Sequence, residues 1–124
     1  MQSCVRLSVP AQAMYARTVR MMAANLAVVC ELDVDEVEDV RMAAEEGFVY
    51  ACATRPETCE VSFDLGPDEI VMGFSLGDDE LEEEGDETDL DLALLLLAAV
   101  CDDCGLTDDG SALRIIKKVG VHAE

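Results

Sequence analysis

The chain has 124 residues, 51% of them hydrophobic, so it is long enough and apolar enough to bury one core and too apolar for a disordered segment. Its formal net charge is −20, from 28 Asp and Glu residues against 8 Lys and Arg residues. A field of this sign repels nucleic acid and anionic membranes and favours a basic protein partner. We therefore predict a single domain over residues 1–124 without direct contact to nucleic acid or membrane, although solubility is an alternative reason for the acidity.

The first part of the chain predicts a strand followed by two helices. Cys4–Val9 alternates between polar and apolar residues, which is typical of a strand. Met14–Cys30 has a helical stripe that we predict to be buried, made of Met14, Val19, Met22, Leu26 and Val29. Asp35–Ala53 predicts a second helix, with its own stripe at Val37, Val40, Ala44, Phe48 and Ala51. Asp33 and Asp35 are both candidates for its N-cap, since a carboxylate accepts the free N–H groups there.

The middle of the chain predicts a hairpin and an acidic loop. Cys59–Leu65 and Glu69–Leu76 are strand-like and are separated by the turn sequence Gly66-Pro67-Asp68. The acidic loop covers Gly77–Asp89, where like charges repel one another and little is apolar, so we predict that it is mobile. It lacks the alternating spacing of a calcium loop. A solvated loop and a docking surface for a basic partner remain the two interpretations.

The last part predicts a third helix and a closing hairpin. Leu90–Cys101 is apolar on all sides, so we expect no broad side of this helix to face water. Its run Leu92–Val100 is too short to span a bilayer. Cys104–Thr107 and Ser111–Val119 then form two strands. The whole order predicts an α+β fold: a two-layer sandwich in which three helices cover one face of a mostly antiparallel five-stranded sheet.

The six cysteines suggest reduced thiols rather than disulfides. No secretory signal precedes them, and Cys30 and Cys52 fall in helical apolar patterns, so we predict a cytoplasmic protein. Cys101 and Cys104 have the spacing of a redox or metal pair, but no second pair accompanies them and His122 is the single histidine. We therefore predict no metal site and interpret Cys101 and Cys104 as a reduced packing pair.

Three segments carry a resemblance to a known family. Arg6–Pro10 precedes a long helix, Glu36–Glu46 has the pattern of a nucleotide-box helix, and Leu94–Asp102 leads into Leu113–Lys118. Together they resemble the anti-sigma factor serine/threonine kinases of the histidine-kinase-like (GHKL) ATPase superfamily. The resemblance implies that fold and a role in bacterial transcription regulation. It also implies binding of ATP and Mg²⁺, phosphorylation of a serine on an anti-anti-sigma factor, and sequestration of a sigma factor.

The residues that would serve the nucleotide are largely replaced. By the resemblance, Glu46 retains the box glutamate, whereas Tyr50 stands where the family has the Asn that holds Mg²⁺. Ser75 stands near the adenine-reading Asp, and Gly77 retains the glycine of that motif. The acidic loop replaces a glycine-rich lid, and its carboxylates would repel phosphate. We therefore predict no cofactor, with Glu46 a relic of the catalytic base and the Tyr50 ring filling the vacated pocket.

Three functions follow from these observations. The first is a regulatory protein-binding domain, resembling an anti-sigma factor, that sequesters a sigma factor or an anti-anti-sigma factor without ATP. The second is an active ATP-dependent serine/threonine kinase with Glu46 as its base, and bound Mg-ATP would distinguish it. The third is an acidic mimic of nucleic acid, which would bind many basic partners with strong salt dependence. The oligomeric state stays open, and a homodimer agrees with the resemblance.

Overall fold

The computed structural model describes residues 3–77 and 95–118. In chain order, the elements are β1 (Ser3–Pro10), the 3-10 helix η1 (Ala13–Tyr15), α1 (Ala16–Val29), α2 (Val34–Ala53), β2 (Thr58–Leu65), β3 (Glu69–Ser75), β4 (Asp103–Leu106) and β5 (Ala112–Lys118). Residues 95–100 are also helical. The acidic loop beyond Gly77 lies outside the described residues, so its mobility stays a prediction.

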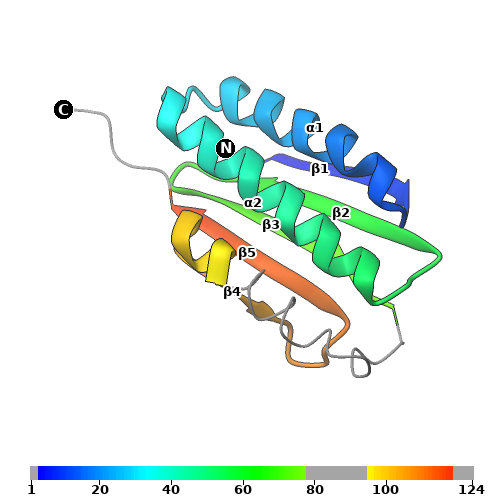
Figure 1. The fold of residues 1–124 in the computed structure, drawn as a ribbon. Coiled ribbons are helices and arrows are strands. Elements are labelled where there is room, and N and C mark those ends of the chain that lie inside the picture. The colour runs from blue at the N-terminus through cyan, green and yellow to red at the C-terminus, as the bar shows by residue number, and fades with distance from the viewer. Residues whose placement is uncertain (1–2, 78–94, 119–124) are drawn as a thin grey trace.

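The five strands form one sheet with the order β1-β2-β3-β5-β4, and every neighbouring pair is antiparallel. The strands β2 and β3 form the predicted hairpin, whose turn is closed by a 3.0 Å hydrogen bond from Gly66 N–H to the Glu69 carbonyl. The helices α1 and α2 lie side by side across one face of the sheet (Figure 1). The prediction of a two-layer α+β sandwich is therefore confirmed.

The core lies between the sheet and these helices. Alternate residues of each central strand point into it, as the period of two requires: Val61, Phe63, Leu65, Ile70, Met72, Phe74, Leu113 and Ile115 are buried. From α2, the predicted stripe is buried at Val40, Ala44, Phe48 and Ala51. Gly47 allows a close approach of α2 to the sheet, because a Cβ atom there would lie 2.6 Å from Cε1 of Phe74. The helix thus rests directly on the sheet at this residue.

Backbone hydrogen bonds and one side-chain cap define the turn between α1 and α2. Leu32 N–H donates to the Ala27 carbonyl at 3.1 Å, and Glu31 N–H donates to the Val28 carbonyl at 2.9 Å. This is a Schellman ending in which Glu31, with φ of 64°, takes the left-handed position that usually belongs to glycine. The next helix begins at once, with Asp33 and Glu36 forming a reciprocal capping box. Of the two candidate caps, the structure selects Asp33.

We expect Asp33→Ala to lower the free energy of unfolding by about 1 kcal/mol, because it removes the acceptor of the 2.8 Å bond from Glu36 N–H. Urea unfolding of the purified protein measures this change. Asp35→Ala is the matched control, since Asp35 lies in the first turn of α2 without forming the cap. Equal losses for the two variants would contradict the assignment of Asp33.

The structure corrects the expected burial of two helices. In α1, Val19 and Leu26 are buried as predicted, but Val29 is exposed, as is Met14 on η1, because the side of α1 that faces the core carries Ala16, Ala23 and Ala27. In the described part of the third helix, Leu97 is fully buried while Leu95 is 66% exposed. Only one side of that helix packs on the core. For residues 95–100, the expectation that no broad side would face water is therefore wrong, and Cys101 follows the helix rather than ending it.

Candidate functional site

The four residues implied by the resemblance lie on α2 and at the end of β3. Glu46 and Tyr50 are one helical turn apart on α2, whereas Ser75 ends β3 and Gly77 follows it. The ends of the two elements meet at Thr54, whose hydroxyl accepts a 2.7 Å hydrogen bond from Gly77 N–H. The same hydroxyl donates to the Ala51 carbonyl at 2.6 Å. Gly77 is thus brought against the end of α2, while Glu46 lies roughly two turns earlier in the helix.

Three of these four residues serve the packing of the protein itself. The Tyr50 side chain belongs to the hydrophobic core and is only 7% exposed. The Ser75 hydroxyl accepts a 2.8 Å hydrogen bond from Glu60 N–H. Gly77 is so close to α2 that a Cβ atom would lie 2.3 Å from the Thr54 carbonyl oxygen. These residues do not fit ATP and Mg²⁺: the Tyr50 phenol replaces an amide ligand and is packed in the core, and the Gly77 amide is already bound to Thr54.

Glu46 is the remaining candidate for chemistry. It is half-buried, and burial followed by the charge of Glu45 raises the pKa of its carboxyl above the ordinary value. Both effects disfavour the ionised form in which a carboxyl acts as a general base. Glu45 itself forms a 3.4 Å ion pair with Arg20 of α1. Across residues 3–77 and 95–118, no group of three or more His, Cys, Asp and Glu side chains is arranged to hold a metal ion.

The cysteines are free thiols: Cys4, Cys30, Cys52, Cys59, Cys101 and Cys104. The Cys101 thiol donates a 2.8 Å hydrogen bond to the Leu97 carbonyl. Burial and the neighbouring Cys104 raise the pKa of Cys101 to about 12. A thiol with so high a pKa is a poor nucleophile and a poor metal ligand at neutral pH. The structure therefore agrees with a reduced pair at these two positions.

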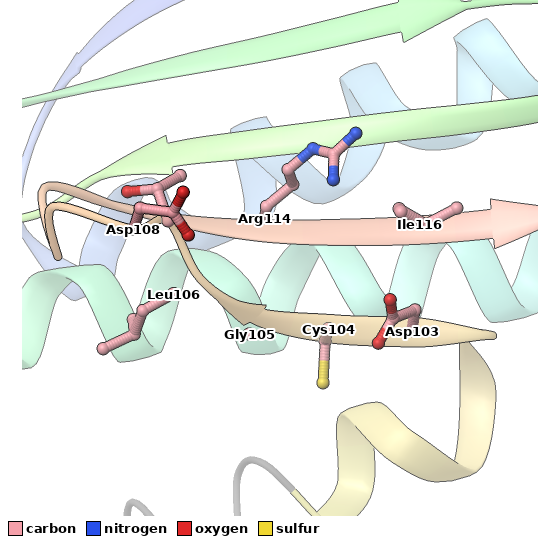
Figure 2. Close-up of a pocket in the computed structure, with 8 residues that line it drawn as sticks. Asp103, Cys104, Gly105, Leu106, Asp108, Arg114 and Ile116 are labelled. Carbon is pink, nitrogen blue, oxygen red and sulfur yellow. The ribbon is translucent and has the colours of Figure 1, made fainter.

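An open hollow of about 380 Å³, which the sequence did not predict, lies at the edge of the sheet formed by β4 and β5 (Figure 2). Its lining includes Arg114, Asp103 and Asp108. Cys104 of β4 also belongs to the lining, but its side chain and that of Arg114 on β5 point to opposite sides of the sheet. One guanidinium and two carboxylates without a paired nucleophile and base do not form a catalytic arrangement. The hollow is also separate from the four residues described above.

Exposed apolar side chains gather instead on the helical side of the molecule. In the described residues, nine of the ten large hydrophobic side chains that are exposed lie on helices, and the tenth is Leu106 on β4. Two of the nine, Leu95 and Leu96, belong to the third helix. The other seven lie on η1, α1 and α2, and we call them the hairpin face: Met14, Met21, Val28, Val29, Val34, Met42 and Val49. The spacing of seven from Met14 to Met21 to Val28 is the sequence signal that could have revealed it.

Comparison with known proteins does not assign this arrangement to a family. No protein-family model matches the chain, and no curated protein matches it. Among the described residues, no helix is both long enough and apolar enough to cross a membrane. The hairpin face is the feature that the packing of the described residues leaves without an explanation.

Proposed function

We propose that this domain is a regulatory protein-binding domain that sequesters a basic protein partner without ATP. The observation that carries the proposal is the hairpin face. Apolar side chains scattered singly on a surface are ordinary, but several gathered on one helical pair are typical of a protein contact. Met14 and Val34 are 73% and 77% exposed, so little of their apolar area is buried by the domain itself.

The charge around the hairpin face supports a basic partner. Residues 13–53 carry eight carboxylates and three arginines, within a chain of net charge −20. Two of the three arginines already pair with carboxylates of α2, Arg20 with Glu45 and Arg41 with Glu38. An apolar patch bordered by excess negative charge favours a partner with an apolar patch bordered by Lys and Arg. A sigma factor or an anti-anti-sigma factor is the partner that the resemblance implies.

The packing of Tyr50, Ser75 and Gly77 supports independence from ATP. We expect millimolar Mg-ATP to leave the melting temperature unchanged, because the protein does not bind it. A ligand that did bind, at one hundred times its Kd, would add about 2.7 kcal/mol of stability and raise the melting temperature. Tyr50→Asn should not create binding, since the Gly77 amide would still be bound to Thr54. Differential scanning fluorimetry with Mg²⁺ alone as the control measures this. A rise in melting temperature with Mg-ATP only would favour the kinase instead.

The proposal is tested by isolating the partner. The full chain is immobilised and exposed to an extract of its source organism, and the captured proteins are identified by mass spectrometry. The partner is then purified and its Kd measured with and without Mg-ATP. We expect a basic protein whose Kd does not depend on the nucleotide. A complex that forms only with ATP, or the absence of any saturable partner, would contradict the proposal.

A further inference from the structure

The residues of the hairpin face lie in three rows across η1, α1 and α2. The helices α1 and α2 are antiparallel neighbours joined by a short loop (Figure 1). The ion pair between Arg20 and Glu45 shows which residues of α1 lie next to which residues of α2. With this alignment, the exposed apolar residues meet in rows: Met14 with Val49, Met21 with Met42, and Val28 and Val29 with Val34. The face therefore runs along the whole hairpin, with apolar side chains from both helices in every row.

The spacing within each helix suits contact with another helix. Met21 and Val28 of α1 are seven residues apart, as are Met42 and Val49 of α2, and Met14 of η1 precedes Met21 by seven. Side chains at this spacing form a nearly straight line along a helix and are typical of seams between helices. A third helix laid along α1 and α2 would place its own apolar stripe between the two lines. The hairpin face thus favours a helix over an extended peptide, for which alternate residues would be needed.

The charge at the two ends of the face is unequal. Glu31 and Asp35 are exposed beside the turn between α1 and α2, next to the row that contains Val34. At the other end, the exposed Arg17 lies close to Met14. A partner helix with its cations at one end is therefore favoured in one direction. A second copy of the chain is disfavoured as the occupant, because two molecules of charge −20 would have to approach each other.

We infer that the hairpin face binds one amphipathic helix of the partner, with its Lys and Arg residues concentrated over the turn between α1 and α2. This inference rests on the proposed function and adds to it the contact surface, the secondary structure of the partner segment and its direction. Binding buries the apolar side chains of Met21 and Met42, whose flexible chains adapt to the shape of the incoming residues. The carboxylates beside the turn fix the register and speed the encounter.

The test uses the full chain and a synthetic peptide as the probe. The labelled peptide has about 21 residues, roughly six helical turns, with Leu at heptad spacing and Lys concentrated at one end. Fluorescence anisotropy should show saturable binding, with a Kd about tenfold higher for Met21→Gln/Met42→Gln because most binding energy lies in central apolar contacts. Leu106→Gln on β4 is the matched control and should bind like the parent.

Two control peptides separate the apolar contact from general charge attraction. One keeps the Lys residues but replaces Leu with Ser, and the other keeps Leu but replaces Lys with Glu. We expect neither to bind measurably under the same salt conditions. Equal binding of the Ser peptide, or equal Kd values for the parent and Met21→Gln/Met42→Gln, would overturn the inference. Met21 and Met42 are both exposed, so Met21→Gln/Met42→Gln should fold, and circular dichroism checks this. The variant Met14→Gln/Val49→Gln repeats the binding test in the neighbouring row of the hairpin face.

Neutral substitutions test the direction of the bound helix. Glu31→Gln/Asp35→Asn removes two carboxylates beside the turn, whereas Asp64→Asn/Asp68→Asn removes one on β2 and one in the turn between β2 and β3. The first pair should slow association of the peptide several-fold at low salt, and the second should change it little. Equal effects of the two pairs would overturn the assigned direction, because they would show that only the overall charge matters.

The inference and the proposed function fail in different ways. A captured partner that binds Met21→Gln/Met42→Gln as tightly as the parent would overturn the inference while the proposed function stands. If no partner is captured, the proposed function itself fails. Sedimentation of the parent alone should show a monomer. A dimer that Met21→Gln/Met42→Gln dissociates would overturn the inference by showing that a second copy occupies the hairpin face.

Discussion

Replacement of Phe74 by alanine is expected to lower the free energy of unfolding by about 3–5 kcal/mol, one of the two largest effects we predict. Phe74 is fully buried in β3, and its ring meets α2 at Gly47. Its loss leaves a cavity between the two layers that neither the helix nor the sheet can close. Urea unfolding followed by circular dichroism measures the change.

Val71→Ala is the matched control for Phe74→Ala. Val71 lies on the same strand but faces the other side of the sheet, where it is half-buried. Val71→Ala should therefore lower the free energy of unfolding clearly less than Phe74→Ala does. Equal losses for the two variants would contradict the assignment of the core to the helical side of the sheet.

Gly47→Ala should destabilise the protein by about 1–3 kcal/mol, although alanine favours an isolated helix over glycine. The new Cβ atom would lie 2.6 Å from Cε1 of Phe74 and 2.9 Å from Cδ1 of Ile115. The side chains of Phe74 and Ile115 are both fully buried, so α2 or the strands must shift to make room for the methyl group. The measurement is again the free energy of unfolding in urea.

A double variant shows whether close packing is the cause. Gly47→Ala/Phe74→Leu should lose less stability than the sum of its two single substitutions, because the shorter side chain leaves room for the methyl group. Gly105→Ala is the control, since a Cβ atom at Gly105 would meet nothing within 4 Å. Strict additivity of the two substitutions at Gly47 and Phe74 would show that they act independently.

The layers of the fold could be predicted because apolar residues recur about every 3.6 residues in the helices and every second residue in the strands. The stripe Val40, Ala44 and Phe48 points to the core as its helical spacing requires, and the strands β2 and β3 alternate as expected. The prediction failed at Met14 of η1 and at Val29 of α1, because α1 is apolar on two sides. Its core side consists largely of alanines, and the larger methionines and valines gave the stronger but misleading signal.

The candidate site was less predictable, because it depends on contacts between distant segments. The Gly77 amide is hydrogen-bonded to Thr54, 23 residues away, and no local sequence pattern predicts that contact. The hollow beside Arg114 exists because β4 is an edge strand, which only the strand order reveals. The hairpin face could be predicted only in part. The heptad spacing of Met14 and Met21 is visible in the sequence, but their exposure follows from the direction in which α1 packs.

Methionine methyl spectra test most directly whether the hairpin face holds the protein partner. The described residues include Met14, Met21 and Met42 on the face, with Met22 half-buried and Met72 in the core. With ¹³C-labelled methyl groups, titration of the captured basic protein should shift the signals of Met14, Met21 and Met42 and leave Met72 unchanged, with or without Mg-ATP. A complex that leaves the three face methionines unchanged would contradict the account.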